Sequence, residues 1–346
     1  MSENSMVERI PSKIREPLNR SLHIARAAKQ DEFYTQLTDI EKELRHYWKH
    51  FKGKIVLCNC DDPRVSNFFH YFSYYFEKLG LKKLIATCYK NQDAERFSKH
   101  ASERGVYLVY EGNKNGCVPD PAKIHVHKLE GDGDFRSEEC VELLKQADIV
   151  VTNPPFSLFR EYVGQLVEYG KKFLIIGNHN AITYKEIFTL IKSAKLWLGY
   201  MHPVAFVVPD HYELRSVGSW RDENGTNWRS LGNVCWFTNL ELQKRHEDLI
   251  LYRPYDPKLY PTYDNYDAIE VARVADIPVD YNGVMGVPIT FLDKYNPDQF
   301  TILGTSDRGG DNVPEIDAIR LTEKKLDSCL VRGKKVYKRL FIQRRK

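Results

Sequence analysis

From residue 54 onward, short runs of apolar and β-branched residues alternate with segments whose apolar positions recur at helical spacing. This alternation is typical of a parallel sheet whose strands are connected by helices. The apolar runs predict seven strands, at 54–59, 83–88, 123–128, 148–152, 172–177, 195–208 and 233–238. Helices are expected at 64–79, 92–104, 137–146, 157–169 and 182–193. The predicted fold class is therefore α/β, with a doubly wound, mostly parallel sheet of seven strands.

The segments on either side of this pattern differ from it. Residues 31–50 have apolar positions on one helical face, which predicts a helical lead-in to the sheet. Residues 245–300 are crowded with Pro, Tyr, Asp and Asn, which indicates turn-rich, irregular structure rather than further αβ units. We therefore expect an arm at 1–30, a main domain at 31–245 and a smaller appended module at 246–346.

Composition narrows the class of protein. With 42% apolar and 28% charged residues the chain is globular, and its longest apolar runs are far shorter than the roughly 18 residues of a membrane-spanning helix. The first 30 residues are charged throughout and contain no apolar core of a signal peptide. The seven cysteines include no C-x-x-C pair, which predicts reduced thiols in a cytoplasmic protein. Cys58 with Cys60, and His125 with His127, alternate on strands without zinc-finger spacing, so we expect no metal site.

Charge is unevenly distributed along the chain. The formal net charge is +4, but residues 332–346 carry +8, residues 1–30 carry +3 and the middle carries −7. Basic ends around an acidic middle favour a polyanionic partner, and they are equally compatible with solvated tails.

The most informative stretch is Asn153-Pro154-Pro155-Phe156, which follows a predicted buried strand at the sheet edge where open α/β folds bind ligands. The prolines keep the carbonyls of Asn153 and Pro154 out of a helix. The Asn153 side-chain oxygen and one such carbonyl can then accept both protons of a planar amino group, while Phe156 offers a face to its ring. Accepting both protons stabilises the tetrahedral nitrogen formed when the amine attacks. We predict these four residues to be catalytic; the alternative is a plain proline-rich turn.

Several segments resemble one known family. They are residues 31–36, from Asp31 to Gln36; residues 58–69, from Cys58 to Phe69; residues 131–137, from Gly131 to Ser137; residues 152–162, from Thr152 to Tyr162; and residues 276–288. Together they resemble the EcoRI-type adenine-N6 DNA methyltransferases, and the resemblance covers roughly residues 29–300. The order of cofactor motifs, catalytic motif and recognition region is that of the γ arrangement of amino-methyltransferases.

The resemblance implies a Rossmann-like methyltransferase fold with S-adenosylmethionine (SAM) as cofactor. It places cofactor contacts at Tyr34, Thr35, Asn59, Cys60, Asp61, Pro63, Asp134, Phe135 and Asn153. Independently, the helix expected after Pro63 presents its N–H groups to a carboxylate such as that of SAM. By resemblance, Asp134 accepts from the SAM adenine and Phe135 packs on that ring; a turn carboxylate is the alternative for Asp134. The loop at 60–63 lacks the usual glycine, and the strand ending at Cys88 lacks the acid that commonly binds ribose.

Double-stranded DNA is the expected partner. N6 of adenine is out of reach for in-line transfer within a duplex, so the base must be flipped out, and phosphate contacts from the basic ends offset the cost. Candidate DNA-binding residues are Arg26, Arg215, Arg221, Asn227, Arg229, Lys334, Lys335, Lys338 and Arg339. We expect the protein to be a monomer that does not associate with a membrane. A cognate restriction endonuclease, where one exists, would act on the same DNA site.

Two other functions fit parts of the sequence. The planar amine could be N4 of cytosine, an amine of an RNA base or a protein glutamine amide, because related motifs serve all three. The chain could also be a DNA-binding protein with a decayed methyltransferase fold, which the glycine-free loop at 60–63 leaves open. The intact Asn-Pro-Pro-Phe motif favours the enzyme.

Overall fold

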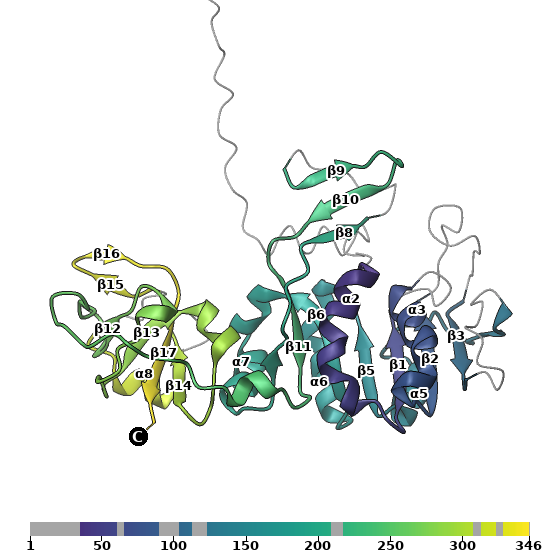
Figure 1. Ribbon diagram of the computed structural model, residues 1–346, viewed down its shortest axis with the longest axis horizontal. Helices are drawn as coiled ribbons and strands as arrows, with labels where there is room; N and C mark the ends of the chain where they lie inside the picture. Colours follow the sequence, from purple (N-terminus) through teal and green to yellow (C-terminus); the bar gives the residue numbers. More distant parts are fainter. Residues whose placement is uncertain are drawn as a thin grey trace, which may run out of the picture.

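The computed structural model describes residues 35–60, 66–89, 104–112, 123–208, 217–306, 313–322 and 328–345. Within these residues a large mixed sheet occupies the centre of the molecule, with smaller sheets beside and above it (Figure 1). The expected arm at 1–30, and all but the last residue of the helix expected at 92–104, lie outside the described residues.

The large sheet has eight strands in the order β4-β3-β2-β1-β5-β6-β11-β7. They are β1 (Ile55–Asn59), β2 (Lys83–Cys88), β3 (Val106–Tyr110), β4 (Val126–Lys128), β5 (Ile149–Thr152), β6 (Lys172–Asn178), β7 (Trp197–Leu198) and β11 (Val234–Thr238). The four central strands β2, β1, β5 and β6 are parallel, whereas β3, β4 and β11 run antiparallel to their neighbours. The structure is thus α/β with a large, mixed sheet, and the predicted count of seven strands is wrong by one.

The strand missed by the sequence prediction is β3. Its buried residues Val106, Leu108 and Tyr110 alternate with the partly exposed Tyr107 and Val109. Such alternation is typical of an antiparallel strand with one solvated face, and it is weaker than the continuous apolar run of a central parallel strand.

The single strand predicted at 195–208 is also wrong. The chain instead forms β7 in the large sheet and β8 (Ala205–Val207) in another sheet. The break has a clear cause, because the backbone N–H groups of Tyr200 and Met201 donate to the buried carboxylate of Glu43, at 2.7–3.0 Å, rather than to a neighbouring strand. A buried side chain from the lead-in helix therefore takes the backbone out of the sheet.

Helices connect the strands near the predicted positions. They are α2 (Leu37–Leu44) continued by η1 (Arg45–His50), α3 (Asn67–Tyr74), α4 (Phe76–Leu79), α5 (Glu138–Gln146), η3 (Phe156–Leu158), α6 (Phe159–Glu168), η4 (His179–Thr183) and α7 (Lys185–Lys192). Helix α6 shows why they form: Phe159, Tyr162, Val163 and Leu166 recur at helical spacing and are all buried.

The order of the strands reverses next to β1. The chain passes from β1 to β2 on one side, whereas β5 pairs with β1 on the other. The point where strand order reverses leaves a crevice outside the carboxyl ends of the two strands, and ligands of open α/β sheets bind there. Val56, Leu57, Val150 and Val151 are almost completely buried, so both strand ends are held firmly in place.

A second sheet is built by the C-terminal residues. It has the order β12-β13-β17-β14, with β12 (Ile269–Glu270), β13 (Met285–Pro288), β14 (Phe300–Thr305) and β17 (Arg339–Arg344), next to helix α8 (Pro314–Ala318) and the hairpin β15 (Leu330–Val331) and β16 (Lys334–Lys335). Turns dominate residues 247–268, as expected, but β12 and β13 lie within the segment predicted to be irregular. Both sheets share one hydrophobic cluster, in which Trp197 stacks on Tyr295 with ring centroids 6.0 Å apart.

A three-stranded antiparallel sheet stands above the large one (Figure 1). Its order is β8-β10-β9, with β9 (Ser219–Arg221) and β10 (Asn227–Ser230). Strand β10 leads directly into β11, whose first residue, Val234, pairs with Asn178 at the carboxyl end of β6. The small sheet therefore rises from the carboxyl edge of the large one. No helix in the described part of the chain is both long and apolar enough to cross a membrane.

Candidate active site

Asn153 lies directly beyond β5, at the point where the strand order reverses. It is only 8% exposed, and its amide Nδ2 donates to the hydroxyl of Thr35 at 3.3 Å. Thr35 is itself buried, and its carbonyl accepts from Asn67 Nδ2 at 2.7 Å. The lead-in segment and α3 thus hold the donor end of the Asn153 amide in place.

The two prolines act as predicted on the backbone. Pro155 is extended, with φ −54° and ψ 125°, and helical structure begins only at Phe156. The Pro155 carbonyl is the first to accept a helical-type bond, from Leu158 N at 3.0 Å. The Pro154 carbonyl therefore precedes the helix, where it can accept from a ligand.

Two hydrogen bonds from buried side chains tie the end of β1 to α6 and to β5. The Tyr162 hydroxyl donates to Asn59 Oδ1, and the Thr152 hydroxyl donates to the Asn59 carbonyl. Burial raises the pKa of Tyr162 well above its usual value, so the hydroxyl stays protonated and remains a donor. Tyr162 had no predicted role, because only its position on the buried face of a helix was visible in the sequence.

Cys60 provides the sharp turn that a glycine usually makes. Its φ is 87°, in the left-handed region, and its N–H donates to the Thr87 carbonyl at 3.1 Å. The loop at 60–63 therefore makes its left-handed turn without a glycine, because Cys60 adopts the positive φ itself. Predicted cofactor residues Tyr34, Asp61 and Pro63 lie outside the described residues.

The loop bearing Asp134 and Phe135 is pressed against the end of β2. Gly133 has φ +81°, and a Cβ there would collide with the Cys88 carbonyl oxygen. Phe135 is 8% exposed and packs edge-on against Tyr162, with ring centroids 5.0 Å apart. Through Tyr162 and Asn59, Phe135 is therefore connected to the strand that carries Asn153.

Asp134 has a partner that the sequence analysis missed. Arg136 donates to both of its carboxylate oxygens, through Nε at 2.9 Å and Nη2 at 2.7 Å, and also to Glu161 at 2.8 Å. These bonds raise the pKa of the Arg136 guanidinium. The backbone N–H of Arg136 also donates to Asp134 Oδ1, at 2.9 Å, so Arg136 holds the Asp134 carboxylate in one orientation.

The candidate DNA-binding residues fall into two groups. Arg221 and Arg229 lie on the small sheet, where Arg221 Nε donates to Asn227 Oδ1 at 2.8 Å. Asn227 is buried, so it orients Arg221 and does not present its own amide to a base. Lys334, Lys335 and Lys338 are exposed in and beside the hairpin β15–β16, which rises on the same side in Figure 1. Arg26 and Arg215 lie outside the described residues.

Arg339 differs from these lysines. It donates to the Glu270 carboxylate through Nε at 3.0 Å and Nη2 at 2.5 Å, and both side chains are about nine-tenths buried. We therefore interpret Arg339 as part of the C-terminal sheet's structure, and we no longer expect it to contact DNA.

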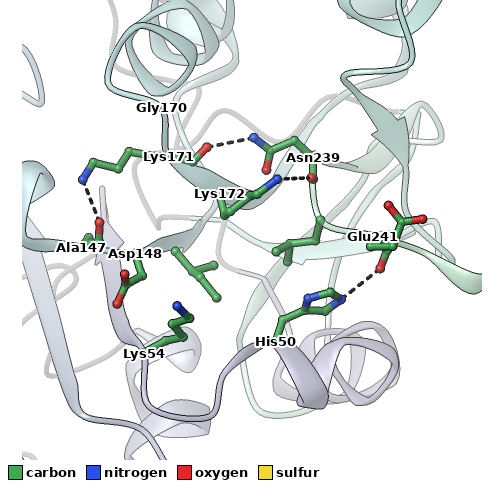
Figure 2. A pocket seen from close by; sticks show the side chains of 11 residues that line it. His50, Lys54, Ala147, Asp148, Gly170, Lys171, Lys172, Asn239 and Glu241 are labelled. Carbon is green, nitrogen blue, oxygen red and sulfur yellow. Dashed lines mark hydrogen bonds between the residues drawn. The ribbon is translucent and has the colours of Figure 1, made fainter.

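A cavity of about 500 Å³ lies at the opposite, amino edge of the sheet (Figure 2). Two of its ammonium groups donate to backbone carbonyls: Lys171 to Lys145 and Ala147, each at 2.8 Å, and Lys172 to Asn239 at 3.3 Å. Burial lowers the pKa of Lys171. None of the predicted catalytic residues lines this cavity, and its cations stabilise strand starts, so we place the functional site at the carboxyl edge.

Comparison with known proteins identifies the family of this chain. Residues 21–345 match the family described as adenine-specific methyltransferase EcoRI. The Type II methyltransferase M.EcoRI of Escherichia coli is 55% identical over 295 residues, which cover 84% of this chain and 90% of the relative. M.MgeORF184P of Mycoplasma genitalium is 40% identical over 81% of this chain and 84% of its own length. M.MpnI of Mycoplasma pneumoniae is 39% identical over 81% and 83%. No solved structure matches. The chain belongs to the EcoRI family of adenine-specific methyltransferases.

Proposed function

We propose that this enzyme transfers a methyl group from SAM to N6 of an adenine flipped out of a specific site in duplex DNA. Its family makes it an adenine-specific DNA methyltransferase; the donor, the flipped base and the roles of individual residues are proposed. The observation that carries the proposal is the position of Asn153, buried at the reversal of strand order and held through its amide nitrogen by Thr35.

The amino group of the target base is activated by two acceptors. Asn153 Oδ1 accepts one N6 proton and the Pro154 carbonyl accepts the other, while Phe156 packs on the face of the purine. The nitrogen lone pair, otherwise delocalised into the ring, becomes available as the nitrogen turns tetrahedral. The amine loses its proton to water after attack, so no strong general base is required.

The residues around β1 fit SAM. The left-handed turn at Cys60 opens the end of β1 towards the crevice. Arg136 orients the Asp134 carboxylate, which we propose accepts from the adenine amino group of SAM, and Phe135 provides an apolar ring beside it. When bound there, SAM supplies an electrophilic methyl group. Thr35, Asn59 and Tyr162 act by positioning their neighbours. Thr35 holds the amide of Asn153, and Tyr162 holds Asn59 at the end of β1.

DNA is proposed to lie across the carboxyl edge. Arg221 and Arg229 on the small sheet and Lys334, Lys335 and Lys338 near the C-terminal hairpin would contact phosphates or base edges. In this arrangement residues 31–245 form the SAM-binding catalytic domain, and 1–30 and 246–346 contribute DNA contacts. We propose that a monomer carries out the reaction, at a site that a cognate endonuclease would share.

A labelling experiment tests the proposal. The protein is incubated with methyl-tritiated SAM and, separately, with duplex DNA, RNA or protein; the product is digested to nucleosides or amino acids and separated. We expect label in N6-methyladenine from duplex DNA, and methylation-sensitive sequencing then locates the site. Label confined to cytosine, RNA or protein would refute the proposal, and SAM binding without transfer to any substrate would favour the decayed DNA-binding protein.

A further inference from the structure

The small sheet carries a tryptophan in an unusual setting. Trp220 on β9 pairs across the strands with Trp228 on β10, and the two indole rings lie parallel, with centroids 6.0 Å apart and planes within 6°. Trp220 is nevertheless 43% exposed. One face of its ring is thus backed by another aromatic ring, while a large part of the indole remains open to solvent.

The backing ring is itself held rigidly. Trp228 Nε1 donates to Asp222 Oδ2 at 2.9 Å. The other oxygen of Asp222 accepts from the backbone N–H groups of Asn224 and Thr226, each at 2.9 Å, which closes the turn between β9 and β10. The hairpin, the turn and Trp228 therefore fix Trp220 in place before any ligand binds, so little side-chain entropy remains to be lost on binding.

The position of this hairpin relates it to the target base. Strand β10 runs into β11 at the carboxyl end of β6, the same sheet edge at which β5 ends directly before Asn153. Figure 1 shows the small sheet above this edge. Arg221 follows Trp220 in the strand, so the two side chains lie on opposite faces of the hairpin. Arg221 is exposed and is oriented by Asn227. A cation on one face and an aromatic surface on the other complement the phosphates and the bases of one duplex.

Flipping creates the need for such a ring. When adenine leaves the stack, its neighbours lose a stacking partner, and inserted apolar side chains are a recurrent way to fill such a gap. We infer that Trp220 enters the base stack at the position vacated by the target adenine and so favours the flipped state. Trp220 is then a positioning residue that never touches the reacting nitrogen. The inference rests on the proposed function.

The test compares substrates that differ in the energy of flipping. Wild type and Trp220→Ala are assayed on unmethylated duplexes that contain the target sequence identified for the wild type. In one duplex the target adenine is paired, and in the other it lies opposite an abasic position. We expect Trp220→Ala to lower the methylation rate on the paired duplex by about tenfold, the loss of one base–aromatic stack, and by less than about threefold on the abasic duplex. With 2-aminopurine as the target base, the rise in fluorescence on binding should fall in parallel.

Two further variants separate stacking from folding. Trp220→Phe keeps an aromatic face and should stay within about threefold of wild type. Leu259→Ala removes another exposed apolar side chain, 69% exposed, and should change nothing. An equal loss for Trp220→Ala on both duplexes, or an undiminished 2-aminopurine signal, would overturn the inference while leaving the proposed function standing. Failure of the wild type to methylate adenine in DNA would overturn both.

Discussion

The two edges of the large sheet are built from different side chains. At the carboxyl edge, Asn59, Thr152, Asn153 and Tyr162 are buried, uncharged and joined to neighbours by hydrogen bonds. At the amino edge, lysines 171 and 172 donate to backbone carbonyls around a cavity that also contains charged carboxylates. Lysines line the amino edge, yet the residues that we propose to be catalytic lie at the carboxyl edge.

The difference follows from what each edge has to do. Ammonium groups at strand starts satisfy orphan carbonyls, and solvent screens their charge. An amino group must instead meet acceptors held at fixed positions, because its N–H groups become stronger donors as the nitrogen gains positive charge in the transition state. Buried acceptors with fixed geometry are therefore a better sign of an amine-methylating site than cations that serve strand starts.

Asn153→Ala should have the largest effect, because it tests the proposed catalytic role of the carboxyl edge directly. Removing the acceptor that stabilises the tetrahedral nitrogen should lower kcat by about a hundredfold to a thousandfold. SAM binding, measured by calorimetry, should change by less than about threefold, because Thr35 and Asn59 keep their own hydrogen bonds.

The matched control lies at the other edge. Lys172→Ala removes an ammonium group that donates to the Asn239 carbonyl at the amino edge, so methylation should stay within about twofold of wild type. If Asn153→Ala lost SAM binding and catalysis equally, its assigned role would be wrong; a large loss for Lys172→Ala would show that the amino edge matters to the reaction.

Tyr162→Phe probes the hydrogen bonds that join β1 to α6. Deleting the hydroxyl leaves the buried Asn59 Oδ1 without this donor, which should lower the free energy of unfolding by about 1–3 kcal/mol. The KM for SAM should rise about tenfold as β1 loosens, measured by initial rates at saturating DNA. Tyr75→Phe removes a comparable bond, to the exposed Glu41, and should alter stability by less than about 0.5 kcal/mol.

These residues also show which parts of the site the sequence could predict. Asn153 and its prolines could be interpreted directly, because the constraint acts between chain neighbours. The partners Tyr162 and Asn59 are 103 positions apart, and their contact exists only once α6 has packed on the sheet. Arg136 could have been suggested by its closeness to Asp134 in the chain, but its bidentate geometry could not.

The errors about the fold have the same origin. The strand expected at 195–208 was interrupted by Glu43, whose distance along the chain from Tyr200 is 157 residues. Arg339 lies in a basic run, yet Glu270, 69 residues away, draws it into the C-terminal sheet. Local pattern predicted most elements, whereas long-range polar contacts decided where elements end and which charges remain for a partner.

Substitutions at Cys60 test the left-handed turn at the carboxyl edge. Because φ is positive there, Cys60→Gly should keep or raise stability by up to about 1 kcal/mol. Cys60→Val places a β-branched residue in the left-handed region and should lower stability by about 2 kcal/mol and weaken SAM binding. Denaturant unfolding and SAM calorimetry of both variants check this. Equal behaviour of the two would mean that the turn at Cys60 is not left-handed in solution.

The smallest expected effect depends on pH and again separates the two edges. At the carboxyl edge, His202 Nε2 lies 3.3 Å from Asp293 Oδ1, and this nearby carboxylate raises the pKa of His202. At the amino edge, burial lowers the pKa of His50. The stabilisation from the His202 pair is therefore fully present below the unfolded pKa of about 6.5 and is lost as pH rises through the higher folded pKa. For His50 the sign is opposite, since protonation at low pH is disfavoured in the folded state and the stability of the protein is lost as pH falls.

Urea unfolding should show His202→Gln destabilised relative to wild type at pH 5.5, by less than about 1 kcal/mol because the side chain is half exposed, and much less at pH 8.5. For His50→Gln, the difference in the free energy of unfolding from wild type should be smaller at pH 5.5 than at pH 8.5. Identical pH trends for the two variants would contradict the contrast between a histidine held by a carboxylate and one held neutral by burial.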